Sequence, residues 1–101
     1  MDNSHLRDLI EEATIDCYDE DEQFWGFYAA LEDLSFPFRA TVLGESVRIT
    51  GLSSKSNLRR GVMIELKKQG RTYAFPLSEI DATELKGERA AWVAAYQLWS
   101  Q

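Results

Sequence analysis

The densest chemical feature of the sequence is a run of acidic residues near its start. Asp19 to Glu22 are four consecutive carboxylates, and Asp16 precedes the run by three positions. Carboxylate oxygens suit hard cations such as Ca²⁺ and Mg²⁺, whereas Zn²⁺ prefers nitrogen and sulfur ligands. The chain contains one histidine and one cysteine, which is too few for a typical zinc site. The run therefore makes calcium or magnesium the chemical candidate.

The run does not match an EF-hand. An EF-hand loop requires glycine at its sixth position and glutamate at its twelfth. Counted from Asp19, those positions hold Phe24 and Ala30. Successive side chains on a helix are rotated by about 100°, so the four adjacent acids cannot all face one ion. Asp16 can share a face with Asp19 or Glu20, and an ion site here would be of another kind.

A second acidic pair, Glu32 and Asp33, stands just before the segment Phe36-Pro37-Phe38. Proline disfavours helical geometry in the residue before it, so a helix that ends here exposes backbone carbonyl oxygens. Such oxygens are also calcium ligands, and this exit could hold a second ion. Acids in a first helical turn also stabilise helices and keep proteins soluble. The residues alone leave ion binding and this structural role equally open.

Charge is segregated along the chain, whose formal net charge is -6. Residues 1–34 carry eleven acids and one base, whereas residues 35–78 carry two acids and eight bases. The net negative charge argues against non-specific nucleic-acid binding and against adsorption to anionic membranes, because both require positive charge. No signal peptide or membrane-spanning run is evident, and a single cysteine suits a reducing compartment. We therefore expect a cytoplasmic protein without a membrane partner.

Catalytic constellations are nearly absent from the sequence. His5 is the only histidine, and its position near the start of the chain suggests no Ser-His-Asp or Cys-His arrangement. Gly51 and Gly61 fit neither the P-loop nor the dinucleotide-binding spacing. We therefore expect a non-catalytic protein.

The secondary-structure patterns predict one α+β domain over residues 1–101. Helices are predicted over 5–14, from an Asp19 cap to about Asp33, and over 83–99. Strands are predicted at 38–43, 46–51, 61–67 and 71–75. The resulting fold has N-terminal helices, a four-stranded antiparallel meander and a C-terminal helix. The meander is expected to form a strongly bent sheet or a small barrel.

Two aromatic stripes are assigned to the core. The first follows the second helix (Phe24, Phe27, Tyr28, Leu31 and Leu34), and the second follows the last helix (Trp92, Ala95, Tyr96 and Trp99). Gly26 lies beside the first stripe and is expected to permit close packing. Glu22 at the third helical position is expected to complete a capping box with Asp19, and Asp81 to Thr83 offer a cap for the last helix.

Several segments resemble one known family. They are Asp16-Cys17-Tyr18-Asp19-Glu20-Asp21-Glu22-Gln23, Leu31-Glu32-Asp33, Phe36-Pro37-Phe38-Arg39-Ala40 and Ala74-Phe75-Pro76-Leu77-Ser78, with a closing aromatic segment that ends in Trp99. Their order and spacing resemble the CcbP family of small cyanobacterial calcium-binding proteins. The resemblance implies a non-EF-hand protein that buffers or sequesters intracellular Ca²⁺ and regulates heterocyst differentiation. Matching acidic positions imply the metal ligands Asp16, Asp19, Glu20, Glu32 and Asp33.

Two other functions remain as alternatives. A small barrel could bind nucleic acid through a basic face around residues 55–71, formed by Lys55, Arg59, Arg60, Lys67, Lys68 and Arg71. The acidic surface could instead engage a basic protein partner of unknown identity, with calcium incidental. A solvated strand face that balances the acidic helices is a more ordinary explanation of these bases than nucleic-acid binding.

Overall fold

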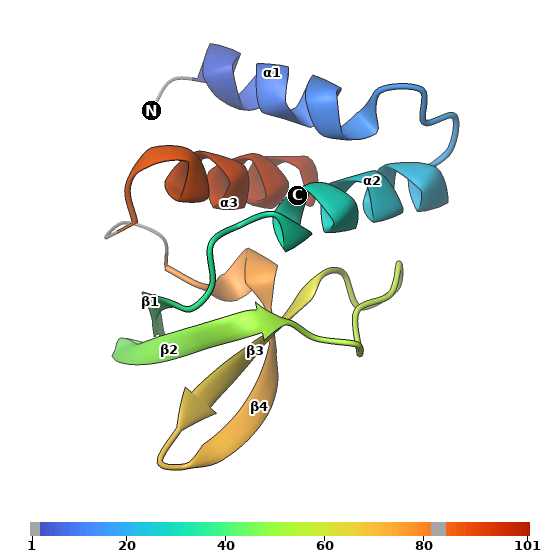
Figure 1. Ribbon diagram of the computed structural model, residues 1–101. Coiled ribbons are helices and arrows are strands. Elements are labelled where there is room, and N and C mark those ends of the chain that lie inside the picture. Colours follow the sequence, from blue (N-terminus) through green and yellow to red (C-terminus); the bar gives the residue numbers. More distant parts are fainter. Residues whose placement is uncertain (1–2, 82–84) are drawn as a thin grey trace.

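The computed structural model describes residues 3–81 and 85–101. Within these ranges the helices are α1 (Asn3–Thr14), α2 (Glu20–Glu32) and α3 (Gly87–Trp99). The strands are β1 (Phe38–Val42), β2 (Glu45–Leu52), β3 (Met63–Lys68) and β4 (Arg71–Pro76), followed by the 3-10 turn η1 (Leu77–Glu79). Figure 1 shows the helices gathered on one side of the molecule and the sheet on the other. The predicted α+β class and strand meander are confirmed.

The sheet is open and antiparallel, with the strand order β1-β2-β3-β4. Both outer hairpins turn through two residues with positive φ, namely Leu43 and Gly44 in one and Gln69 and Gly70 in the other. Such turns match the right-handed twist of the strands they join. The predicted small barrel is wrong, because β1 and β4 lie at opposite edges and do not pair.

The start of α2 is capped as the sequence predicts. The Asp19 carboxylate accepts a hydrogen bond from the Glu22 backbone N–H at 2.8 Å. The Glu22 carboxylate accepts one from the Tyr18 N–H at 3.0 Å. The reciprocal bond of the capping box therefore goes to the residue before the cap.

The predicted start of the last helix is wrong, because α3 begins at Gly87 rather than at residue 83. Asp81 does not cap it, because the N-cap position of α3 is Lys86; the backbone of Asp81 pairs instead with Thr41 in an isolated bridge beside β1. Lys86 is extended and stands at the N-cap position without a side-chain bond. The remainder of the predicted cap, through Thr83, lies outside the described residues.

Both predicted aromatic stripes enter one hydrophobic core. Phe27 is fully buried, and its ring contacts those of Trp92, Tyr96 and Trp99 at centroid distances of 4.9–6.4 Å. α3 also packs along α1 and against η1. The C-terminal helix is thus held mainly by the other helices. None of the helices in residues 3–81 and 85–101 is long and apolar enough to cross a bilayer.

Gly26 allows α1 and α2 to approach closely. A Cβ atom at this position would overlap the backbone carbonyl oxygen of Ala13 in α1 and would lie 3.4 Å from Cys17 Sγ. The oxygen is part of a helix backbone, so it cannot move aside as a flexible side chain would. The expected close packing at Gly26 is confirmed.

Tyr96 joins α3 to the segment that enters β3. Its hydroxyl oxygen accepts a hydrogen bond from the Val62 N–H at 2.9 Å, and both residues are buried. Burial raises the pKa of the Tyr96 hydroxyl above its ordinary value, although the bond from Val62 opposes the shift. The neutral phenol is therefore the form that the core favours.

We predict that Gly26→Ala lowers the free energy of unfolding by about 1–3 kcal/mol, because the added methyl group overpacks the contact between α1 and α2. Urea unfolding followed by circular dichroism measures this change. Gly51→Ala is the matched control, since no atom lies within 4 Å of the added Cβ. The control should be neutral or slightly stabilising. Equal stability of wild type and Gly26→Ala would contradict the close-packing account.

We predict that Tyr96→Phe costs about 1–3 kcal/mol at neutral pH, because the buried Val62 N–H loses its acceptor. In the wild type the folded state keeps the phenol proton to higher pH than the unfolded chain does, so stability falls above about pH 10. The variant has no phenol at this position, so its stability does not fall in this way. The difference in unfolding free energy between the two proteins should therefore narrow as the pH rises. Urea unfolding between neutral and alkaline pH measures it. Tyr18→Phe, at an 87% exposed position, should change neither quantity.

Candidate metal centre

The link between α1 and α2 positions three of the predicted ligands. Asp16 lies in this link with a φ of 59°, the left-handed region that aspartate tolerates better than most residues. Asp19 ends the link as the N-cap of α2, and Glu20 is the first helical residue. All three side chains are exposed. We call Asp16, Asp19 and Glu20 the link group.

The backbone of the link adds further oxygen atoms. In the described part of the chain, the carbonyl oxygens of Asp16, Cys17 and Tyr18 accept no intramolecular hydrogen bond. The Asp19 carboxylate accepts one bond and keeps further lone pairs. Carboxylates, carbonyls and waters are the oxygen ligands that calcium collects in groups of about six to eight. The link thus offers the correct kind of ligand in one short segment.

The acids are not preassembled around one point. Within residues 3–81 and 85–101, no three His, Cys, Asp or Glu side chains are grouped as they would be around a metal ion. Calcium tolerates flexible geometry and completes its shell with carbonyls and water. An ion at the link would therefore depend on side-chain rotation and on backbone oxygens.

The other two predicted ligands lie at the far end of α2. Glu32 is the last residue of this 13-residue helix and Asp33 is its C-cap. A helix of this length spans about 20 Å at 1.5 Å per residue. The five predicted ligands therefore form two separate groups, the link group and a pair that we call the exit pair.

One member of the exit pair, Asp33, lies near cations of the protein itself. Asp33 lines a cleft of about 470 Å³ together with Lys86, Glu88 and Arg89. Arg89 Nη2 donates a 2.7 Å hydrogen bond to the Ser35 carbonyl, and its guanidinium lies 4.8 Å from the centre of the Phe38 ring. A metal ion here would be repelled by two positive side chains.

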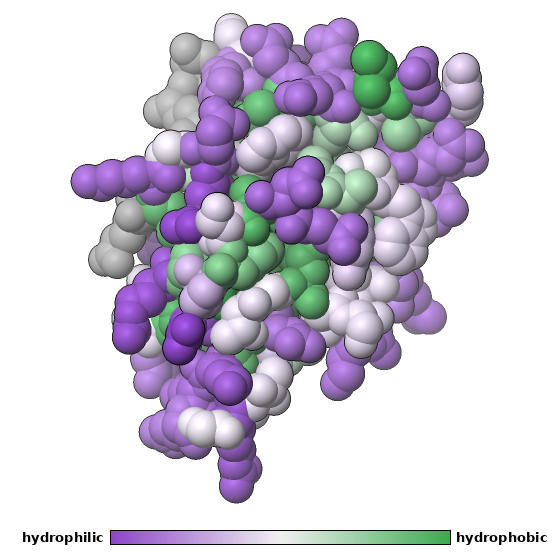
Figure 2. All heavy atoms as spheres, viewed as in Figure 1, coloured by the Kyte–Doolittle hydropathy of each residue, from purple (hydrophilic) through white to green (hydrophobic). Residues whose placement is uncertain are grey.

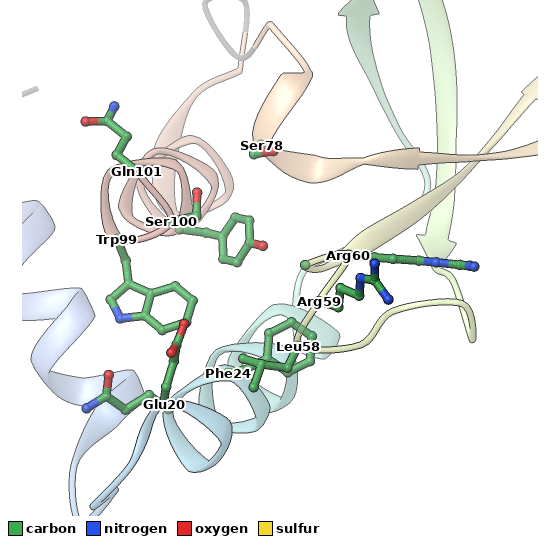
Figure 3. A pocket seen from close by; sticks show the side chains of 12 residues that line it. Glu20, Phe24, Leu58, Arg59, Arg60, Ser78, Trp99, Ser100 and Gln101 are labelled. Carbon is green, nitrogen blue, oxygen red and sulfur yellow. The ribbon is translucent and has the colours of Figure 1, made fainter.

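Glu20 lines a different cleft, of about 440 Å³, between the start of α2, the loop before β3 and the end of α3. Figure 3 shows Glu20 below Trp99 on one side and Arg59 and Arg60 on the other. Within the described residues, no ion pair joins Glu20 to either arginine. The carboxylate of Glu20 is therefore not neutralised by a fixed partner.

No pattern in the sequence indicates that Arg89 is a neighbour of the exit pair. Its contact with Ser35 joins positions 54 residues apart, and no local pattern connects them. The only available signal was an unassigned arginine in the last helix. The two clefts likewise come from tertiary packing rather than from any motif.

Three comparisons with known proteins bear on identity. A family model described as calcium binding, of the CcbP type, matches residues 8–100. The crystal structure of Anabaena CcbP is similar with a TM-score of 0.82 and 21% identity, over 99% of this chain and 91% of that chain. A calcium-binding protein in its calcium-binding form gives a TM-score of 0.78 and 23% identity, over 98% and 90%. No curated protein is similar enough to count as a match.

The two kinds of similarity carry different conclusions. At 21% and 23% identity, the solved structures establish the fold and no more. The family model is independent of that likeness. Because it covers residues 8–100, the chain belongs to the CcbP family of calcium-binding proteins.

Proposed function

We propose that this protein binds Ca²⁺ without catalysing a reaction, and that the link group supplies the principal ligands. The proposal rests on the carboxylate and backbone carbonyl oxygens of the link, in a chain that belongs to a calcium-binding family. Three carboxylates, Asp16, Asp19 and Glu20, belong to one short segment with three backbone carbonyls that accept no hydrogen bond from the described part of the chain. None of these carboxylates forms an ion pair in the described residues. A structural neighbour is itself described in a calcium-binding form.

The exit pair is the second candidate position, with weaker binding. The negative end of the α2 dipole favours a cation near Glu32 and Asp33. No base stands in the last turn of α2, but Lys86 and Arg89 approach from α3 and its N-cap. Arg89 also occupies the Ser35 carbonyl, an oxygen that an ion could otherwise use, so we rank this pair below the link group.

Ligands on an exposed surface suit a buffering role. Every ligand in the proposal is solvent-exposed, so calcium can enter and leave without opening the core. We infer that the protein sequesters intracellular calcium in the cytoplasm. Regulation of heterocyst differentiation, which the family resemblance implies, belongs to the same proposal.

In its described residues, the structure does not have the basic barrel face on which the nucleic-acid alternative depended. It required one basic face on a barrel, but the sheet is open. Lys55, Arg59 and Arg60 lie in the loop before β3, whereas Lys67, Lys68 and Arg71 lie at the other end of β3. These bases therefore belong to two separate regions.

Binding of a basic protein by the acidic surface remains an alternative. It predicts that the protein captures its partner in calcium-free buffer, and that variants of Asp19 and Glu20 weaken this capture.

We predict that calcium stabilises the chelator-treated protein. At a hundredfold excess over Kd, binding to the native state alone adds about 2.7 kcal/mol to the free energy of unfolding. For a chain of this size, that corresponds to a rise in melting temperature of about 10–20 °C. Titration calorimetry and thermal unfolding measure the two effects. Absence of both binding heat and a melting shift at millimolar calcium would overturn the proposed function.

We predict that the double variant Asp16→Asn, Asp19→Asn binds calcium at least about tenfold more weakly, because each change removes a charged ligand. Asparagine tolerates the left-handed region and caps helices as well as aspartate does, so the fold should persist. Glu11→Gln, Glu12→Gln is the matched control, since it removes two exposed charges from α1. Equal losses in both variants would show a diffuse charge effect and refute the link as the site.

A further inference from the structure

The two outer hairpin turns lie at the same end of the sheet. Lys68 Nζ and Glu45 Oε2 form a salt bridge of 2.6 Å between the second turn and the first. We call this region the hairpin end. It is defined by six residues of the four strands and the first turn: Arg39, Leu43, Arg48, Lys67, Arg71 and Tyr73. In Figure 1 it lies at the lower left of the molecule.

Three cations form a row across the outer face of the hairpin end. The strand register sets Arg39 opposite Arg48, and Arg48 opposite Lys67. All three side chains are exposed, and in the described residues none of them forms an ion pair. Like charges directly opposite each other destabilise a sheet. The row therefore destabilises the sheet to which it belongs, and it is placed to bind an external anion.

The same end exposes apolar side chains. Leu43 is 89% exposed at the tip of the first turn, and its φ of 51° is unfavourable for leucine. Tyr73 is 46% exposed and lines a groove of about 400 Å³ between the hairpins, whose other walls include Val47, Leu66 and Phe75. Neither solubility nor turn geometry accounts for leucine at this tip, where asparagine or glycine is preferred.

The acidic residues of the helices are held away from the hairpin end, and Glu45, which lies at that end, is paired with Lys68. Figure 1 places the α1–α2 link at the upper right, opposite the hairpin turns, and the longest extent of the molecule is 41 Å. Charges are screened over about 8 Å at physiological ionic strength. Figure 2 shows hydrophilic side chains surrounding the lower tip in the same view. An anionic surface that meets the hairpin end therefore encounters mainly positive charge, although the whole chain is negative.

We propose that the hairpin end docks on an anionic phospholipid surface. The row of Arg39, Arg48 and Lys67 faces the phosphate groups, and Arg71 adds a fourth cation beside the second turn, from the opposite face of the sheet. Leu43 enters the acyl boundary, and Tyr73 lies at the headgroup level, where tyrosine is enriched in membrane proteins. A nucleic-acid backbone would use the cations but would gain nothing from an exposed leucine at the tip. The combination of cations and an apolar tip favours lipid.

The test is co-sedimentation of the whole protein with vesicles in a chelating buffer. Vesicles of phosphatidylcholine with about one third phosphatidylserine should bind the protein, and vesicles of phosphatidylcholine alone should not. The chelator removes calcium, so failure here is distinguishable from failure of calcium binding. Absence of binding to the anionic vesicles overturns the proposal.

Two variants separate the roles of charge and apolar contact. Arg48→Gln, Lys67→Gln should weaken vesicle binding about 25-fold, since each cation near the surface contributes about a fivefold factor. Leu43→Asn should weaken it about tenfold, because the inserted side chain is lost. The same change suits the left-handed turn, so the melting temperature should stay level or rise. A loss of binding therefore cannot be attributed to unfolding.

The control removes equal charge from the other end of β3. Arg59→Gln, Arg60→Gln should leave vesicle binding within about threefold of wild type. A loss equal to that of the hairpin variant would mean diffuse attraction and would overturn the assignment. Unchanged vesicle binding by Leu43→Asn, together with retention of single-stranded DNA, would instead assign the hairpin end to polyanions.

Discussion

The close approach of α1 and α2 at Gly26 is the constraint on which the rest of the structure depends. The Ala13 carbonyl occupies the space that a side chain would need, so the two helices lie in backbone contact. The chain must then reverse direction between Thr14 and Glu20, and it does so with Asp16 in the left-handed region. Helix packing, rather than a dedicated ion-binding loop, thereby sets the conformation of the link that carries the acidic residues.

Features set by neighbouring residues could be predicted from the sequence. The Asp19 cap depends on the N–H of a residue three positions later, and Gly70 marks a turn between two adjacent strands. The start of α3 could not be predicted in this way. Asp81 has the composition of a helix cap, but its backbone pairs with Thr41 on a distant strand. A tertiary contact overrides the local preference there.

The same distinction between local and tertiary contacts applies to the candidate site. Asp16, Asp19 and Glu20 are close in sequence, so their proximity follows from chain connectivity alone. The environment of Asp33 depends on Arg89, which arrives from the last helix and binds the carbonyl of Ser35. Tertiary structure decides which cations lie near each group, because Arg59 and Arg60 share a cleft with Glu20, as Lys86 and Arg89 share one with Asp33. The two groups are similar in composition, and the fold makes them differ because Arg89 donates a hydrogen bond to the Ser35 carbonyl beside the exit pair.

Net charge is a poor guide to the partners of this molecule, because its two ends differ in sign. The value of -6 averages an acidic helical layer and a basic sheet. Repulsion among the carboxylates of the helices is relieved when a cation binds, whereas the opposed cations Arg39 and Arg48 are relieved by an anion. Screening over about 8 Å keeps these two effects largely separate in a molecule 41 Å long. Under the two proposals, each end selects its ligand by local charge, and occupation of one end leaves the other available.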